Sequence, residues 1–490
     1  MDARTARDYL EIGIDRLNKS EPGWKRRDDY YRGRQDLPYA PEGVNEEYLE
    51  LREMALANWL AIAMDAPIQR LRVDGFRTGR DQAADEDTWR NVWQANKMDA
   101  RQRIVYSQMM VHGRGIVSVW PNEARPNEPI VRPENSKRVH LEPNPEDPFT
   151  PLFAVKRWSV VDSRLGSLGV FAAPGTRSIA VVHEGATGDW VRFERGGNLF
   201  TGDWLQTDEG ESPIGEQPFV AYDHKQDADA QPHSAIEPLM SHQDAINTIR
   251  FNTLLAMQFS AFRQRVFTGY DPVVRDERGQ VVWQRNADDS IRLDKQGQPM
   301  PVLNSPGRVG VDRALVFPGV DTKVFDLPES NLKNYIEVLG EFLTQLFATG
   351  QIPPQYLLSR MANLSGDALA GAESTLASLV SDLQTSTGEA HEDLMRKANK
   401  ARGEGSTDLA SEVIWGDGEA RSFAQTVDAI TKLVSVEFPR EAAFEMIPGA
   451  TQTKVKRWME LRDSELANDP ALAQAARILD GSSGAAPSGQ

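Results

Sequence analysis

The sequence predicts an α+β protein that is mainly α-helical, with an antiparallel β region and a small β-rich module between its helices. Three observations predict this class. Apolar residues recur at helical spacing over long segments, short β-branched runs alternate with turn residues in two regions, and no run of apolar residues could span a bilayer. With 40% hydrophobic and 8% aromatic residues, the chain of 490 residues has enough apolar side chains to fold.

The composition excludes several kinds of chemistry. Without cysteine, the chain can form no disulfide, no cysteine-ligated zinc site, no iron–sulfur cluster and no thiol nucleophile. Its 55 Lys and Arg residues against 72 Asp and Glu give a net charge of −17, which disfavours tight binding of nucleic acid through phosphate neutralisation. The charged N-terminus lacks the apolar region of a secretory signal. We expect a protein of a reducing compartment without membrane contact.

The N-terminal part, to about residue 110, is expected to be mainly helical. Apolar residues at helical spacing predict one helix over residues 46–66, stopped or kinked by Pro67, and another over 87–112. The segment 30–33 (YYRG) is interpreted as a helix end packed by tyrosines, with a ligand site as the alternative.

From about residue 115 to 223 the pattern changes to short β runs separated by glycine turns. This alternation predicts an antiparallel β region. The expected strands are residues 116–120, 152–160, 178–183, 190–194 and 219–222.

Three long elements follow. A helix is expected over 234–263, where Ser234 and Glu237 have the spacing of a capping box and Pro238 lies in the first turn. Residues 267–330 are rich in turn residues between short β runs such as 281–284 and 314–317, which predicts a small β-rich module. A second helix is expected over 331–349, stopped by Gly350.

A loop, 351–364 (QIPPQYLLSRMANL), leads to a very long helix over 365–402 that ends at Gly403. Further helices are expected over 422–433 and 453–466. The last ten residues, GSSGAAPSGQ, are expected to be disordered.

Catalytic motifs are missing from the sequence. It contains no Gly-Lys pair, so the usual phosphate-binding P-loop is absent, and its seven histidines are never three or four residues apart. Acidic clusters at 85–87, 288–289 and 392–393 are interpreted as solvated faces. The segment 112–115 (HGRG) could form a phosphate nest, but glycines are also expected at a helix-to-strand connection. We expect no enzyme activity, no cofactor and no metal.

Several short motifs, in this order, resemble those of tailed-bacteriophage portal proteins of the siphophage type. Most specific is the segment 352–357 (IPPQYL), followed by 363–368 (NLSGDA) and 372–373. The resemblance runs from about residue 25 to 465. Its other segments are 31–33, 58–59, 73–76, Trp93, Asn96, 98–99, 112–115, 415–417 and 421–422.

The resemblance implies the portal fold, assembled as a homo-oligomeric ring, typically of twelve subunits. Its expected parts are a wing over 1–233, stem helix 1 over 234–266, a clip over 267–330, stem helix 2 over 331–350, a tunnel loop over 351–364, a long wing helix over 365–403, a C-terminal wing or crown over 404–478 and a disordered tail over 479–490.

The resemblance also implies a function. Such a ring forms the channel at one capsid vertex through which double-stranded DNA is packaged and ejected, without sequence specificity. The implied partners are the terminase large subunit, a head-completion adaptor, and the major capsid and scaffolding proteins. The implied location is the virion, after assembly in the host cytoplasm. Another virion component, such as a minor head protein, and a metal-dependent DNA-processing enzyme are the alternatives.

Two sets of site residues follow from the resemblance. In the tunnel loop we expect weak contact with DNA from Gln351, Gln355, Ser359, Arg360 and Asn363, because Arg360 is the only charged residue there. An ordinary connector between helices is the alternative for this loop. The expected clip residues for partner binding are Trp283, Arg285, Arg292 and Phe317, although core positions are favoured for Trp283 and Phe317.

Overall fold

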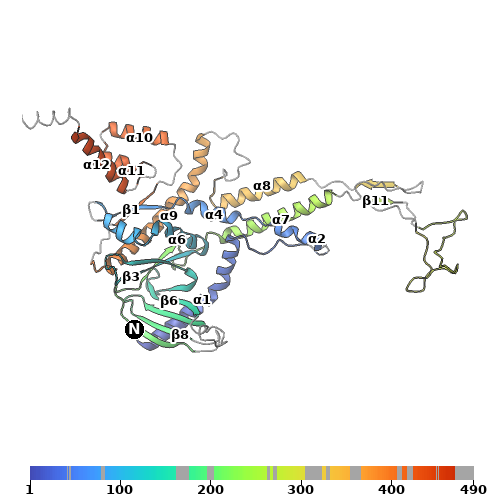
Figure 1. Ribbon diagram of the computed structural model, residues 1–490, viewed down its shortest axis with the longest axis horizontal. Helices are drawn as coiled ribbons and strands as arrows, with labels where there is room; N and C mark the ends of the chain where they lie inside the picture. Colours follow the sequence, from blue (N-terminus) through green and yellow to red (C-terminus); the bar gives the residue numbers. More distant parts are fainter. Residues whose placement is uncertain are drawn as a thin grey trace, which may run out of the picture. The chain divides into compact units, whose positions relative to one another are not determined.

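The protein is described by a computed structural model, and its helices and strands are drawn in Figure 1. The described residues are 1–40, 42, 46–78, 83–161, 176–195, 203–261, 265–268, 273–303, 323–326, 332–353, 366–404, 411–416, 423–436, 438–447, 450 and 452–468. Unit 1 comprises Met1–Leu37, Leu56–Ile246 and Glu341–Gln490, and unit 2 comprises Pro38–Ala55 and Asn247–Gly340. Within the described residues, no helix has the length and apolarity needed to cross a membrane.

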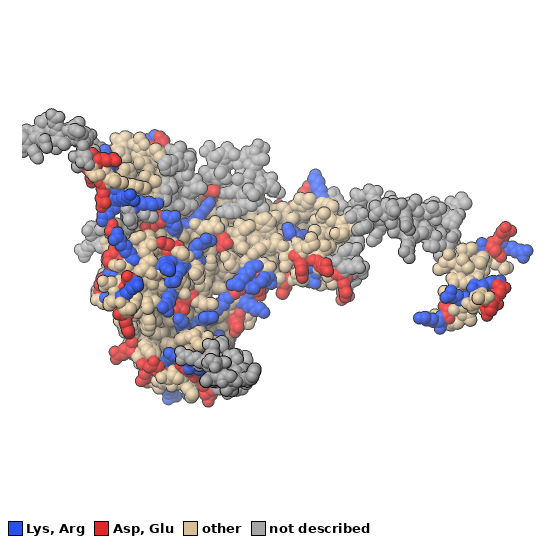
Figure 2. Space-filling view, in the orientation of Figure 1, with Lys and Arg blue, Asp and Glu red and all other residues tan. Residues whose placement is uncertain are grey.

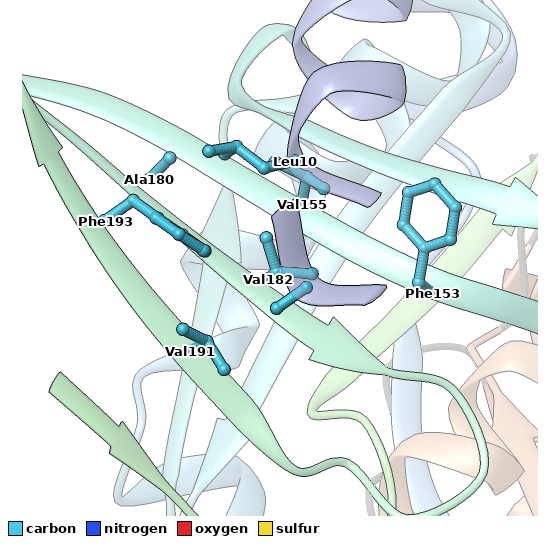
Figure 3. Close-up of a cluster of buried hydrophobic side chains, with 8 residues drawn as sticks. Leu10, Phe153, Val155, Ala180, Val182, Val191 and Phe193 are labelled. Atoms are coloured by element: carbon cyan, nitrogen blue, oxygen red, sulfur yellow. The ribbon is translucent and has the colours of Figure 1, made fainter. Parts of the chain in front are cut away.

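The main core of unit 1 lies between helix α1 (Ala3–Tyr31) and a five-stranded antiparallel sheet. Figure 3 shows Leu10 of α1 facing Val155, Val182 and Phe193 of the sheet. Gly13 lets α1 come close, because a Cβ there would lie 2.4 Å from a methyl carbon of Val155. The strands, in sheet order, are β5 (Val139–Pro143), β6 (Pro151–Val161), β7 (Thr176–Glu184), β8 (Trp190–Arg195) and β9 (Leu205–Gly210).

The described residues of unit 1 also form two three-stranded sheets. One has the order β10-β3-β4, with β3 at Arg114–Trp120, β4 at Ile130–Glu134 and β10 at Phe219–Asp223. The other has the order β13-β1-β2, with β1 at Val73–Thr78, β2 at Ala83–Ala84 and β13 at Glu412–Trp415. All five predicted strands are confirmed. The strands that the sequence did not predict are at most six residues long and lack clear alternation.

The single helix predicted over 46–66 is wrong. The chain forms α2 (Glu46–Leu49), α3 (Leu51–Ala55) and α4 (Trp59–Ile68) instead. The break lies at Asn58, whose side-chain oxygen accepts a hydrogen bond from the Ala61 N–H at 3.2 Å and so caps α4. Pro67 lies inside the last turn of α4 and does not stop the helix before it.

The helix predicted over 87–112 is also interrupted. It consists of α5 (Glu86–Thr88), the π-helix η1 (Trp89–Gln94) and α6 (Met98–His112), and the 3₁₀ turn η2 (Ser136–Arg138) follows β4. The interruption lies at Lys97, which has a left-handed backbone with φ 57°. Side-chain periodicity does not reveal such a break, because the apolar stripe continues through it.

The predicted capping box at the start of α7 (Glu237–Ala261) is wrong. The Ser234 hydroxyl donates to the Val111 carbonyl at 2.7 Å and accepts from the Ile236 N–H. The Glu237 carboxylate forms an ion pair with Arg27 of α1 at 2.6 Å rather than reaching back to the helix start. Tertiary partners from other elements have replaced the local cap.

The later helices agree with the sequence. They are α8 (Leu332–Thr349), α9 (Gly366–Ala401), α10 (Phe423–Ser435) and α12 (Gln452–Asn468), together with the unpredicted short helix α11 (Arg440–Glu445). Gly403 has φ +79°, the left-handed conformation expected of a residue just beyond a helix end. In unit 2, β11 (Arg265–Thr268) pairs with β12 (Lys323–Asp326). The predicted run 314–317 and the tail from 479 lie outside the described residues.

A buried histidine fixes α9 to the sheets of unit 1. His391 is 1% exposed, and its Nε2 and Nδ1 atoms lie 2.7 Å from the Tyr106 hydroxyl and 2.9 Å from the Tyr222 hydroxyl. The rings of Trp93 and Trp415 pack on the imidazole at centroid distances of 5.3 and 5.8 Å. Burial lowers the pKa of His391 to about 3, so the ring is neutral at pH 7 and uses one nitrogen as donor and the other as acceptor.

Candidate partner-binding module and channel segment

Residues 273–303 of unit 2 form a small module of three tight turns, here called the hairpin module. Isolated bridges pair the chain across each turn, and two longer-range bridges join Val273 to Leu303 and Trp283 to Pro301. The bridges that flank the turns are Arg275 with Val281, Arg285 with Ile291, and Leu293 with Pro299. This confirms the predicted β and turn character of the part of 267–330 that is described.

The three turns repeat one chemical pattern. The Asp276 carboxylate accepts from the N–H groups of Arg278 and Gln280 at 2.9 Å, and Asp294 accepts in the same way from Gln296 and Gln298 at 2.8 Å. Gly279 and Gly297 have left-handed backbones, with φ +77° and +79°. In the middle turn Asp289, at φ 65°, occupies the position of these glycines.

The module is closed by two rings of backbone hydrogen bonds. In the first, Val274 donates to Val302, Val302 to Val282, and Val282 back to Val274, at 2.7 to 2.9 Å. In the second, Gln284, Met300 and Arg292 are joined in the same cyclic way, at 2.8 to 2.9 Å. Each of these six residues therefore satisfies both its N–H and its carbonyl inside the module.

This cyclic repeat was missed in the sequence. The signal for it is the recurrence of Asp-x-x-Gly-Gln at 276–280 and 294–298, with Asn-x-x-Asp-Ser at 286–290 between them. The turn residues were recognised singly, but their common spacing was not.

The predicted partner-binding residues of the clip lie partly in this module. Trp283 is 37% exposed, so the favoured core position for it is wrong. Arg285 is exposed and forms an ion pair with Asp289 at 2.9 Å. Arg292 is exposed, and its backbone belongs to the second hydrogen-bond ring. Phe317 lies outside the described residues.

The surface of the hairpin module combines exposed apolar side chains with balanced charge. Ile291, Leu293 and Leu303 are 43%, 55% and 58% exposed. Five basic residues (275, 278, 285, 292 and 295) offset five acidic ones (276, 277, 288, 289 and 294). On the face drawn in Figure 2, basic and acidic side chains are likewise intermingled over the described residues. Such a surface is better suited to binding a protein than to binding phosphate groups tightly.

The helices that flank the module in sequence also expose apolar side chains. On α8, Ile336 is 65% and Val338 46% exposed, and on α7 Met257 is 50% exposed. Farther along α8, Leu346 and Phe347 are buried, and the Phe347 ring packs edge-on against Trp59 at 5.9 Å. The end of α8 is thus fixed within unit 1.

The predicted channel segment begins at the end of α8, where Gln351 has a left-handed backbone with φ 55°. The Ile352 N–H donates to the Phe347 carbonyl at 2.9 Å, and the Gln351 N–H donates to that of Ala348 at 3.2 Å. This pair of bonds is a Schellman motif with Gln351 at the position that usually holds glycine. The helix ends at Thr349, directly before Gly350 as predicted, but the left-handed residue is Gln351 and not this glycine. Gln355, Ser359, Arg360 and Asn363 lie outside the described residues.

The acidic clusters have structural roles rather than facing one pocket. Asp85 caps α5, while Glu86 and Asp87 pair with Lys456 and Arg402. Asp393 pairs with Arg396 and Lys397 of the same helix. Burial and the nearby Glu389 and Glu412 raise the pKa of Glu392 to about 7. Over the described ranges, no group of three or more His, Asp or Glu residues could hold a metal ion.

Two other predicted segments have structural roles. Tyr30 and Tyr31 end α1 and donate to Asp244 at 2.7 Å and to Asp65 at 2.8 Å, which confirms the helix-end interpretation. In the segment 112–115, Gly113 ends α6 with φ 89°, and Arg114 makes two hydrogen bonds to the Asp223 carboxylate. The backbone of Arg114 and Gly115 is paired with Asp223 and Tyr222 of β10 in the sheet, which disfavours the phosphate-nest interpretation.

Comparison with known proteins identifies relatives over most of the chain. A family profile described as "Phage portal protein, SPP1 Gp6-like" matches residues 176–466. The portal protein of Mycobacterium phage D29 is 25% identical over 434 residues, which are 83% of this chain and 79% of that protein. The portal protein of Mycobacterium phage L5 is 25% identical over 419 residues, 81% of this chain and 76% of that protein. A solved structure described as "Neck of empty GTA particle computed with C6 symmetry" is 12% identical, with a TM-score of 0.42 over 82% of this chain and 93% of that chain.

Proposed function

The chain belongs to the phage portal protein family, SPP1 Gp6-like, and on this premise we propose that it assembles into the ring-shaped channel of one capsid vertex. As a phage portal protein it is a structural component of the virion and serves DNA packaging. The observation that carries the proposal is the family match over 176–466, which includes α7, the hairpin module, α8 and α9 in one succession.

In the proposed ring, α7 and α8 are the stem helices and the segment 267–330 is the clip. Residues 1–233 with α9 form the wing, and 404–478 complete the wing and the crown. The apolar side chains Met257, Ile336 and Val338 support this assignment, because α7 and α8 leave them exposed in a single chain. Neighbouring copies of the same helices would bury them, and each fully buried aliphatic side chain contributes about 1.5–3 kcal/mol. Twelve subunits are the number expected for such a ring.

The channel segment 351–364 would border the DNA path. The only charged side chain in this segment is Arg360, and the whole chain has a net charge of −17. A wall that neutralised several phosphates at once would hold DNA firmly and slow its passage. Gln351, Gln355, Ser359 and Asn363 would instead offer weak polar contacts that do not depend on the base sequence.

The clip would bind the terminase large subunit during packaging and a head-completion adaptor afterwards. The exposed side chains of Trp283, Arg285 and Arg292 support a role in this contact, and Phe317 belongs to the same proposed surface. Because the six residues of the backbone rings are satisfied internally, we expect partners to be bound there through side chains rather than by strand addition. The wing would contact the major capsid and scaffolding proteins, and assembly would take place in the host cytoplasm.

Negative-stain electron microscopy of the purified full-length chain tests the ring directly. The expected result is a population of ring-shaped particles with a central channel. Monomers or shells at the same concentration would overturn the proposal and favour another virion component.

A further inference from the structure

A pocket of about 290 Å³ in unit 1 is lined by residues of two neighbouring sheets. Aromatic side chains from four strands line it: Trp120 of β3, Trp158 of β6, Trp190 of β8 and Phe219 of β10. The three tryptophans are only partly buried, so they remain available to a ligand. An opening lined by aromatic rings from four strands is a feature of binding sites rather than of a packed core.

Buried polar side chains also border the pocket. His183 is 5% exposed and lies edge-on to Trp120 at 6.0 Å and to Phe219 at 5.5 Å. Its Nδ1 atom and the Nε atom of Arg192 have no hydrogen-bond partner among the described residues, although both side chains line the pocket. Both atoms are buried, so the pocket presents to a ligand mainly its aromatic rings.

The charge of the pocket differs from that of the chain. Arg132, Lys156 and Arg192 line it together with the carboxylate of Glu134, and Arg192 also pairs with Glu194 at 2.7 Å. Glu134 is already occupied, since it accepts from the Lys156 ammonium at 2.6 Å and from the Ser118 hydroxyl at 2.7 Å. Lys156 and Arg192 are thus paired with carboxylates, and the exposed Arg132 is the lining cation that can attract an anionic group on the ligand.

The size of the pocket limits the ligand. About 290 Å³ is the lower end of the range for drug-sized ligands, so the space suits one aromatic side chain and its neighbours better than a large cofactor. Nucleic acid is disfavoured, because Lys156 and Arg192 are already paired with Glu134 and Glu194, whereas phosphate binding needs clustered free cations.

We propose that this aromatic pocket binds an acidic segment of a partner protein, with one aromatic side chain between the tryptophans and an adjacent carboxylate facing Arg132. The proposal does not depend on the ring or on the DNA channel. It adds a second protein-binding site, in a part of the chain separate from the proposed clip.

The test uses the full-length chain and the synthetic peptide acetyl-Gly-Asp-Phe-Asp-Gly-amide, with binding measured by calorimetry and ligand-observed NMR. We expect saturable binding that Trp158→Ala weakens about tenfold, because a stacked aromatic contact and its buried area are lost. The matched control is Trp204→Ala, which should leave affinity unchanged. Trp158 and Trp204 are both partly buried beneath a cation, Lys156 at 5.6 Å and Arg195 at 5.3 Å, but only Trp158 lines the pocket.

A second variant separates binding from folding. Arg132 is exposed, so Arg132→Glu should leave the unfolding midpoint unchanged and lower the affinity for the peptide several-fold. Arg125→Glu, which lies outside the pocket, should lower this affinity less. Absence of saturable binding, equal losses in the pocket and control variants, or equal binding of the peptide with Ala in place of Phe would each overturn the proposal. Displacement of the peptide by oligo(dT) would overturn it in favour of a nucleic-acid site.

Discussion

Gln351 has a backbone conformation that its residue type does not favour. Its φ of 55° is a conformation that costs a non-glycine residue about 1–2 kcal/mol, and the two backbone bonds of the Schellman motif hold it there. The helix ends before Gly350, as the sequence predicted, but this glycine does not take the left-handed conformation. A strained residue at the start of the proposed channel segment fixes the direction in which the chain leaves α8.

We therefore expect Gln351→Gly to raise the free energy of unfolding by about 0.5–1 kcal/mol, because glycine adopts this backbone without steric cost. The measurement is the urea midpoint of the full-length chain. The control is Gln345→Gly in the interior of α8, which should lower stability by about 1 kcal/mol. A loss of stability for Gln351→Gly would contradict the strained conformation.

His391 predicts a dependence on pH. Its pKa is about 3 in the folded chain and about 6.5 when unfolded, so the unfolded state binds the proton more readily between these values. Stability conferred by the neutral ring is fully present above pH 6.5 and falls as the pH decreases. Between pH 7 and pH 5 the loss from this residue should be about 2 kcal/mol.

The variant His391→Gln cannot take up this proton, so its stability should decrease less between pH 7 and pH 5 than that of the wild type, although it is less stable at pH 7. Urea unfolding at the two pH values measures both effects. The exposed His233→Gln is the matched control and should show the wild-type decrease. Equal decreases in His391→Gln and the wild type would mean that another group governs acid sensitivity.

At the scale of elements, α8 has two kinds of surface. Its C-terminal part is anchored by Leu346 and Phe347, whereas Ile336 and Val338 are exposed near its start. A helix with apolar side chains exposed to water is stable beside copies of itself or another apolar surface. The periodicity of α8 was visible in the sequence, but the identity of its neighbours was not.

Ile336→Asp should therefore prevent assembly of the ring without unfolding the chain, because a charge would be buried between subunits. Light scattering after size exclusion should show a shift to small species, with an unchanged circular dichroism spectrum. Asn334→Asp adds the same charge on the same helix at an exposed position and should still assemble. If Ile336→Asp forms normal rings, this face of α8 is not a subunit interface.

At the scale of the whole molecule, the segment after α8 should control DNA passage. Particles built with a chain that lacks residues 353–362 should fail to fill with DNA or to retain it, because the proposed channel would lose the segment assigned to border the DNA path. The DNA content of purified particles is the measurement. Arg360→Gln is the control and should have little effect, since single phosphate contacts are weak. Normal filling and retention by the deletion would refute the channel assignment.

The sequence predicted the regular elements where periodicity was strong. The five β runs, α7, α8, α9 and the two late amphipathic helices all form, with ends within a few residues of those expected. It failed where a tertiary partner outweighed a local signal. Asn58 broke a continuous apolar stripe, and Ser234 and Glu237 bonded to Val111 and Arg27 instead of capping α7.

The sequence predicted the candidate sites less well than it predicted the fold. The clip residues Trp283, Arg285 and Arg292 were chosen by residue type, whereas the closed rings of the hairpin module depend on three turns meeting in space. The aromatic pocket was not predicted at all, because its tryptophans come from three strands in two sheets.

By itself, the sequence determined the class of the protein, the order of its long helices and β regions, and the absence of thiol chemistry. These depend on composition and on periodicities within single segments, which are local properties of the chain. Only the tertiary structure decided which side chains meet, such as His391 with two tyrosines and His183 with Trp120 and Phe219, and that Gln351 adopts a strained backbone. Such contacts join residues far apart in the chain, and no local pattern encodes the distance between them.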